Sequence, residues 1–383
     1  MRIRFVVPLV VLCALVAALF SCTAEGGSIY KTIENEQKAS VSTLEQTLTI
    51  FDILKTGDTQ FPYMVAAGAV YKGTVPDSNN VIGWPIQSKD PIAVSPPVGG
   101  ALCLAMVNYA GAIYGGFFVD GPGMGLYKAT SGPNFSFRPS DGAVAVADSL
   151  VAGQQITLLQ VEPVNNILFA VTATIGPGTS GFTYDLVYSS NGTTFNPTNL
   201  TGLTNKITGV GFFGGAYYVT AGPTLYTGAT PTTLTGSSTF GGFTVDSSDE
   251  LRGVTVDSGY ILIPASSGDV YYNNGVSWAK TGTSDTVNGR QVGFLTVSAR
   301  VGAAGPGDVF LIGADGAGYY TLTTLDNTVT KFSDVTVTGL YAGAVRKILV
   351  DGSTVFMGTA GTGLWRAIFD PALGQVNSAW VHE

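Results

Sequence analysis

Basic residues stand at the openings of several similar apolar segments in this 383-residue chain. These openings carry Gln155, Lys206, Arg252, Arg290 and the pair Arg346-Lys347. Lysine and arginine donate strong hydrogen bonds to carboxylate, sulfate and phosphate groups, and arginine can do so through two parallel bonds. Only 18 residues are Lys or Arg, so chance would scatter them rather than repeat them at equivalent places. We therefore take Lys206, Arg252, Arg290 and Arg346 as candidate residues for binding an anionic ligand.

Acidic residues in neighbouring loops allow a second interpretation of these cations. They could form ion pairs that only keep a funnel solvated, with partners drawn from Asp246, Asp249, Glu250, Asp285 and Asp334. The acidic run from Asp246 to Glu250 could also hold calcium, but its spacing is not that of an EF-hand loop. A solvated loop is the simpler expectation, and we predict no metal site.

Residues for acid–base, nucleophilic or metal-dependent catalysis are scarce. The chain has one histidine, His382, and lacks the G-x-S-x-G, H-E-x-x-H, P-loop and C-x-x-C motifs. Cys103 lies in the apolar segment ALCLAMV, which favours a buried small hydrophobe over a catalytic thiol. The sequence predicts no catalytic residue and no cofactor, and it leaves enzymatic activity open.

The elements that must position the cations form a sevenfold repeat. Each repeat contains an apolar run, a glycine-containing turn, and an aliphatic residue or glycine followed by an aromatic residue. The seven aromatic residues are Tyr71, Tyr127, Tyr188, Tyr226, Tyr271, Tyr319 and Trp365. All-β repeats with a period of about 40 to 50 residues are typical of propeller blades. We predict an all-β fold, a seven-bladed β-propeller of four-stranded antiparallel blades, with these aromatic residues buried between blades.

This fold would bring the cations together. The innermost strands of a propeller start at the same mouth of the central channel, so residues at their openings converge there. A stacked β-solenoid is the structural alternative, but its repeats are shorter and it needs capping ends that we do not find. The sequence therefore predicts a positively charged mouth within a protein whose net charge is −8.

Two predicted hairpins resemble the Asp-box of sialidase-type and related propellers, S-x-D-x-G-x-[ST]-[FW]. They span 189–195 and 272–278, and both have Asn in place of the Asp and are one residue shorter. Asn-Gly also suits a type I′ turn, whose two central residues have positive φ. The resemblance implies propeller topology. The segment Phe137-Arg138-Pro139 resembles the F-R-I-P element of sialidases without its isoleucine, so a glycoside hydrolase or lyase with two carboxylates remains an alternative.

The first residues predict export and a lipid anchor. Two arginines precede an apolar stretch from Phe5 to Phe20 that is too short to span a bilayer, as in a signal peptide. Leu19-Phe20-Ser21-Cys22 resembles a relaxed bacterial lipobox of the spirochaete type, which implies lipidation of Cys22. We predict a signal peptide at 1–21, lipidated Cys22 and a polar tether at 22–44, and the propeller at 45–383. An ordinary cleaved signal peptide is the alternative.

Composition restricts the partners. The sequence pI is about 4.7 and 11% of residues are charged, so no basic stripe is available for nucleic acid. The prediction is a non-catalytic lipoprotein of a bacterial cell envelope, in the periplasmic or surface-facing leaflet of the outer membrane. Its propeller would bind a protein or an anionic, glycan-like ligand. An envelope assembly factor is a further alternative.

Overall fold

The computed structural model describes residues 48–76, 82–84, 94–119, 123–131, 135–175, 181–257, 259–287, 289–302, 308–324, 328–331, 340, 343–370, 375–376 and 380–383. The chain divides into two compact units, residues 1–42 and 43–383, and all of the described residues belong to the second. The predicted signal peptide, Cys22 and the tether lie outside the described residues.

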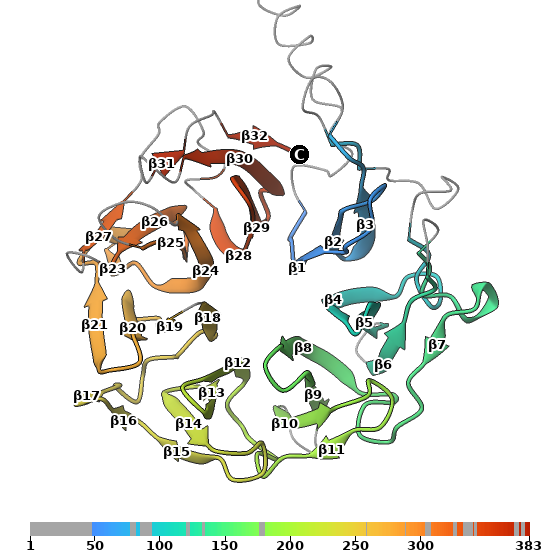
Figure 1. Ribbon diagram of the computed structural model, residues 1–383, viewed down its shortest axis with the longest axis horizontal. Helices are drawn as coiled ribbons and strands as arrows, with labels where there is room; N and C mark the ends of the chain where they lie inside the picture. The colour runs from blue at the N-terminus through green and yellow to red at the C-terminus, as the bar shows by residue number, and fades with distance from the viewer. Residues whose placement is uncertain are drawn as a thin grey trace, which may run out of the picture. The chain divides into compact units, whose positions relative to one another are not determined.

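The second unit is a seven-bladed β-propeller whose antiparallel sheets surround a central axis (Figure 1). Blades 1 to 3 comprise β1 (Asp52–Lys55), β2 (Tyr63–Ala67), β3 (Ala69–Gly73); β4 (Leu102–Tyr109), β5 (Ala112–Phe118), β6 (Gly123–Lys128), β7 (Val144–Ala145); and β8 (Gln155–Glu162), β9 (Ile167–Ile175), β10 (Phe182–Ser189), β11 (Asn196–Pro197). Blade 4 comprises β12 (Ile207–Phe213), β13 (Ala216–Ala221), β14 (Thr224–Gly228) and β15 (Thr235–Ser237).

Blades 5 to 7 comprise β18 (Thr255–Asp257), β19 (Tyr260–Pro264), β20 (Asp269–Asn273), β21 (Trp278–Gly282); β24 (Phe294–Gly302), β25 (Val309–Ala314), β26 (Tyr319–Thr323), β27 (Thr328–Lys331); and β28 (Ala344–Asp351), β29 (Thr354–Ala360), β30 (Leu364–Asp370), β31 (Gln375–Val376), β32 (Val381–His382). Two hairpins, β16 (Thr239–Phe240) with β17 (Phe243–Thr244) and β22 (Thr286–Val287) with β23 (Arg290–Gln291), follow blades 4 and 5. A 3₁₀ helix spans Pro139–Asp141.

Second strands carry continuous apolar runs because both of their faces pack against neighbouring blades. Every residue of β2 and of β25 is buried. A strand covered on both faces has no need of a polar alternation, so it does not show the period of two. The core accordingly consists of clusters between blades, one of which joins β25 and β26 to β28, β29 and β30.

The aromatic residues of the third strands are less buried than predicted. Tyr271 and Tyr319 are buried, whereas the other five are half-buried. The aliphatic residue just before the aromatic is buried in six blades, and these residues are Val70, Leu126, Val187, Leu225, Val270 and Leu364. Successive side chains on a strand point to opposite faces, so the two residues cannot share one interface. The aliphatic residue is the main core position of the repeat.

Two segments that follow third strands contain buried aromatic residues outside any strand. Residues 135–139 do not form the fourth strand of blade 2, which is β7. Phe137 is instead fully buried, with its ring 4.9 Å from that of Phe117, and a Pro-initiated 3₁₀ helix follows it. The fourth strand predicted in blade 1 lies mostly outside the described residues. Its Trp84 is buried and fills the space above Gly73, where a Cβ would lie 2.7 Å from the indole.

The hairpin that resembles an Asp-box is held by the side chain of Asn191. Its Oδ1 accepts hydrogen bonds from the backbone N–H groups of Thr193 and Thr194, both at 2.9 Å. Gly192 has φ +74° and lies against the Tyr114 hydroxyl, so no Cβ fits there. Asn191 does not have positive φ, so the predicted type I′ turn is wrong. The Asn side chain replaces the backbone bond that such a turn would make.

Blade 7 meets blade 1 along a seam of paired charges. Lys347 Nζ lies 2.8 Å from Asp52 Oδ1, and Asp351 accepts hydrogen bonds from Lys55 Nζ and from the Tyr63 hydroxyl. Both acids belong to inner strands, β1 and β28. Each carboxylate therefore has a cation from the opposite blade as its partner.

The outer part of the seam is held by the buried side chain of Glu383. It pairs with Arg366 Nε and accepts a hydrogen bond of 3.1 Å from the Trp84 indole. Both Glu383 and Arg366 are at most 4% exposed. Backbone bonds from Ile50 to Thr359 and from Gly363 to Leu48 add to the closure. Every described strand of blade 7 comes from the end of the chain, so no strand shared with blade 1 closes the ring in the described residues.

Candidate functional site

A β-bulge recurs near the start of the inner strand and aims one residue per blade at the channel. In β12, Ile207 and Gly209 pair with successive residues of β13, and Thr208 between them has no pairing partner in that strand. A bulge leaves one residue unpaired and redirects its side chain. The same shift leaves out Leu104 in β4, Thr157 in β8, Leu295 in β24 and Arg346 in β28.

Equivalent residues occur in the other two blades. Arg252 follows Leu251, which bridges Ala265 just before β18 begins, and Phe51 follows the fully buried Ile50 just before β1. All seven residues line cavities at the channel. We refer to them as the mouth ring: Phe51, Leu104, Thr157, Thr208, Arg252, Leu295 and Arg346.

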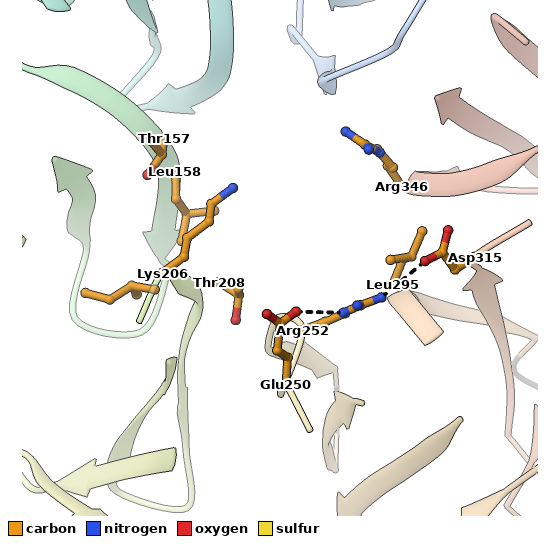
Figure 2. Close-up of a pocket in the computed structure, with 10 residues that line it drawn as sticks. Thr157, Leu158, Lys206, Thr208, Glu250, Arg252, Leu295, Asp315 and Arg346 are labelled. Atoms are coloured by element: carbon orange, nitrogen blue, oxygen red, sulfur yellow. Dashed lines mark hydrogen bonds and ion pairs between the residues drawn. The ribbon is translucent and has the colours of Figure 1, made fainter. Parts of the chain in front are cut away.

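A cavity of about 430 Å³ lies at the mouth and is lined by five of these residues together with Lys206, Glu250 and Asp315. Arg252 is held between the two acids (Figure 2). Its Nε lies 3.3 Å from Glu250 Oε2, and its terminal nitrogen lies 3.7 Å from Asp315 Oδ2. Arg252 is therefore neutralised within the protein, as the ion-pair interpretation expected.

Lys206 and Arg346 differ from Arg252 in their ion pairing. Both are exposed to the cavity, and neither has a carboxylate of the described residues within 4.0 Å. Figure 2 shows the two side chains reaching into the open space from opposite sides. The pKa of Lys206 is lowered by burial among the channel walls and then by the positive charge of Arg346, against a smaller opposing effect of Glu250. The charge of Arg346 is thus close enough to be felt at Lys206.

Both cations also border the other two cavities. The central channel, of about 580 Å³, and a lateral cavity of about 340 Å³ are each lined by Thr157, Lys206 and Arg346. The three cavities therefore meet at these side chains. An anion placed there would be within reach of two positive charges that form no ion pair within the described part of the chain.

Arg290 does not join the others. It is exposed in β23, in a hairpin outside the ring, and the mouth residue of its blade is Leu295. The inserted hairpin separates Arg290 from the inner strand, so aligning the segment openings placed it wrongly. Lys206 also stands two residues before the bulged Thr208, and Gln155 two residues before the bulged Thr157. Arg252 and Arg346 are the only two of the four candidates in the mouth ring.

The sequence interpretation missed the acid Asp315 and the apolar members of the ring. Asp315 lies in the turn after β25 and comes from another blade, so its distance from Arg252 could not be read locally. A sequence pattern marks the mouth ring. In each blade an apolar residue is followed by the ring residue and then by two further residues of the inner segment. This pattern reads IFDI, CLAM, ITLL, ITGV, LRGV, FLTV and VRKI in the seven blades.

The remaining candidate chemistry is limited. Asp246 binds Ser248 in its own loop, Tyr320 donates to Asp285, and Asp334 lies outside the described residues. No group of three potential metal ligands occurs among the residues that the structure describes. Cys103 is buried and its pKa is raised by burial, so it is not a reactive thiolate. In the described ranges, no helix has the length and apolar character to cross a membrane.

No protein-family model matches the chain, and no curated protein matches it significantly. Solved structures do. The WD40 β-propeller domain of Doa1 has a TM-score of 0.53 at 10% identity and covers 84% of this chain and 94% of its own. YCF48 bound to D1 peptide has a TM-score of 0.53 at 12% identity, with coverages of 86% and 97%. An ancestral GH74 enzyme has a TM-score of 0.52 at 14% identity, with coverages of 88% and 47%. At these identities the likeness establishes the β-propeller fold and nothing further.

Proposed function

We propose that this protein is a non-catalytic binding propeller that holds an anionic group of a partner protein at the mouth of its channel. The observation that carries the proposal is the pair Lys206 and Arg346, which face one cavity with no carboxylate of the described residues within 4.0 Å. Repulsion between two like charges held near each other opposes folding. Keeping both cations therefore departs from what the stability of the fold alone would favour. Such departures are expected at functional sites.

An incoming carboxylate would reverse this situation. It would provide a close counter-charge of the kind that Glu250 and Asp315 provide to Arg252. Hydrogen bonds between ionised partners are about twice as strong as neutral ones, and they strengthen further where the walls of a channel exclude water. Binding would relieve the repulsion between the two cations, and this relief would add to the free energy of binding.

Similar propellers support a protein as the partner. One of them, YCF48, has been solved with a D1 peptide bound, and another is a WD40 domain. A glycan-like anion uses the same cations and is the competing ligand. Poly-L-glutamate and polygalacturonate are the probes that distinguish an acidic peptide from an acidic glycan as the ligand.

The test compares two double variants with the same loss of charge. Lys206→Gln with Arg346→Gln removes the mouth cations, and Lys128→Gln with Arg290→Gln removes two exposed cations elsewhere. Binding of fluorescent poly-L-glutamate is measured over a series of salt concentrations. We expect the mouth variant to bind at least about tenfold more weakly and with a flatter salt dependence, and the control to match the natural protein. Equal affinity of the two variants would refute the proposal.

A glycoside hydrolase or lyase is the second candidate, and the observation that favours it is the presence of Glu250 and Asp315 in one open cavity. Such enzymes need one carboxyl group as a general acid, which must stay protonated. Both of these carboxylates are instead engaged by the guanidinium of Arg252. Release of reducing ends from a panel of polysaccharides, abolished in both Glu250→Gln and Asp315→Asn, would make this the better proposal.

We further propose that Cys22 is lipidated and tethers the propeller to a bacterial cell envelope, where it could also serve assembly of other proteins. The support is the sequence pattern of the first 22 residues. We expect Cys22→Ser to abolish incorporation of labelled palmitate and to release the protein from membranes, since stable attachment requires the acyl chains. Unchanged labelling would place the anchor elsewhere or exclude it.

A further inference from the structure

The mouth of the channel is not equally charged on all sides. We infer that it recognises an acidic peptide segment in which an aromatic or large aliphatic side chain is next to a carboxylate. The apolar side chain would occupy the lateral cavity beside blades 1 to 3, and the carboxylate would lie between Lys206 and Arg346. This inference rests on the proposed function and specifies its ligand.

Large apolar side chains gather in the lateral cavity. Phe51 and Phe182 are 38% and 39% exposed, and Leu104, Ala173 and Tyr184 line the same space. The rings of Phe182 and Tyr184 lie 6.4 Å apart, two residues apart on β10 and therefore on one face of the strand. Grouped apolar side chains that remain open to solvent at a hollow mark a binding site more often than single exposed ones do.

The apolar cavity and the cations are contiguous. Lys206 and Arg346 line the lateral cavity as well as the ionic one that holds Arg252. A carboxylate bound by these two cations would have its neighbouring atoms directed into the lateral cavity, into the central channel or toward Arg252. The ion pairs of Arg252 with Glu250 and Asp315 make that side polar. The lateral cavity is the one of the three that offers the rings of Phe182 and Tyr184 to an apolar extension.

A peptide fits this lining better than a sugar does. Among the described residues that line the lateral cavity, the polar side chains other than the two cations are Gln155, Thr157 and the Tyr184 hydroxyl. A sugar ring carries several hydroxyl groups, and leaving them unpaired in such a pocket lowers the affinity. An aromatic or leucine side chain needs no such partners and gains from burial. A volume of about 340 Å³ suffices for one large side chain with its backbone.

Selection from a random heptapeptide library by mRNA display tests the inference. The bait proteins are the natural chain, Lys206→Gln with Arg346→Gln, Phe182→Ser, and the control Val164→Ser. Val164 is 71% exposed in the β8–β9 turn of the same blade and lines none of the cavities described. We expect the natural chain to enrich Asp or Glu within two residues of Phe, Tyr, Trp or Leu. Phe182→Ser should lose the apolar preference and keep the acidic one, and the double variant should lose both.

Affinities of the best selected peptide then give the size of each effect. We expect the peptide to bind about fivefold more weakly to Phe182→Ser and at least about tenfold more weakly to the double variant, with Val164→Ser unchanged. Phe51→Ser serves as a second apolar variant if thermal melting shows that Phe182→Ser is misfolded.

The outcomes separate the two levels of the proposal. Enrichment of acidic residues without an apolar neighbour would overturn this inference and leave the anion site intact. So would Phe182→Ser and Phe51→Ser variants that both bind the peptide as tightly as the natural chain does. Enrichment that survives in the double variant would overturn the anion site as well. Binding of polygalacturonate in the absence of any enriched peptide would assign the mouth to an acidic glycan. Dimerisation that depends on Lys206 and Arg346 would assign it to a second copy of the chain.

Discussion

Arg346 and Lys347 are neighbours on one inner strand, yet they serve different regions of the molecule. Lys347 reaches across the seam to Asp52, which also accepts hydrogen bonds from the backbone N–H groups of Ile53 and Met106. Arg346 is the bulged residue of β28 and faces the channel mouth without an acidic partner in the described ranges. A displacement of one residue along a strand thus separates a structural charge from a candidate binding charge.

The whole seam and the whole mouth also differ in whether their charges are paired. At the seam, acids and cations are matched, and the pair of Glu383 and Arg366 is almost completely buried. At the mouth, matching stops with Arg252, and two exposed cations remain. Buried charges must be paired for the fold to form, whereas cations exposed at an open mouth can remain unpaired until a ligand binds. Substitutions at the seam should therefore affect stability, and substitutions at the mouth should affect binding.

The largest expected effect is at the outer seam. Arg366→Ala leaves the carboxylate of Glu383 buried with only the Trp84 indole as a partner in the contacts described above, and removing one member of a buried pair costs about 3 to 5 kcal/mol. Unfolding in urea measures the loss. A loss below about 1 kcal/mol would show that the seam opens to solvent and that the comparison with the mouth is mistaken.

The adjacent cations provide the next test. Lys347→Ala removes one of three partners of Asp52 and should lower the free energy of unfolding by about 1 to 3 kcal/mol. Arg346→Ala should change it by less than about 0.5 kcal/mol, because an exposed side chain without a partner contributes little. Denaturant melts of the two variants, measured side by side, would contradict the assignment if their order were reversed.

Acid sensitivity at the seam should be smaller. Burial lowers the pKa of His382, whose ring lies 4.8 Å from that of Trp365 on β30. Below pH of about 6.5 the unfolded chain binds a proton more readily than the folded one. Stability should therefore be constant above pH 7 and fall as the pH decreases through 6.5. His382→Gln should flatten the profile between pH 7.5 and 5.5, and an unchanged profile would mean that other groups cause it.

The smallest effect is a gain in stability at the mouth. The pKa of Lys206 is lowered by burial and by Arg346, so its charged form is less favourable in the folded protein than in the unfolded chain. Lys206→Gln should raise the free energy of unfolding at pH 7 by less than about 1 kcal/mol, since solvent screens exposed charges. The gain should vanish as the pH rises toward 10.5, where the lysine loses its proton. Lys128→Gln is the control, and a destabilised Lys206→Gln would contradict an unpaired cation.

Much of the fold was determined by the sequence because each blade is built from local hairpins. The sevenfold repeat predicted the propeller, and apolar runs predicted strands such as β9, β13 and β29 close to their observed positions. Errors arose where packing between blades decides the outcome. Tyr188 was predicted to be buried but lies half in solvent, and Arg290 was predicted at the mouth but lies exposed in the β22–β23 hairpin.

The candidate site divides along the same line. The sequence by itself indicated that cations open several inner strands, because the position of a residue within a repeat is a local property. Only the tertiary structure decided which of these cations keep their charge available. The acids that neutralise Arg252 and Lys347 include Asp315 and Asp52, which belong to other blades, and the bulge that turns Arg346 into the channel depends on its pairing with β29. Coulomb interactions depend on distance in space, which the order of residues along the chain does not specify.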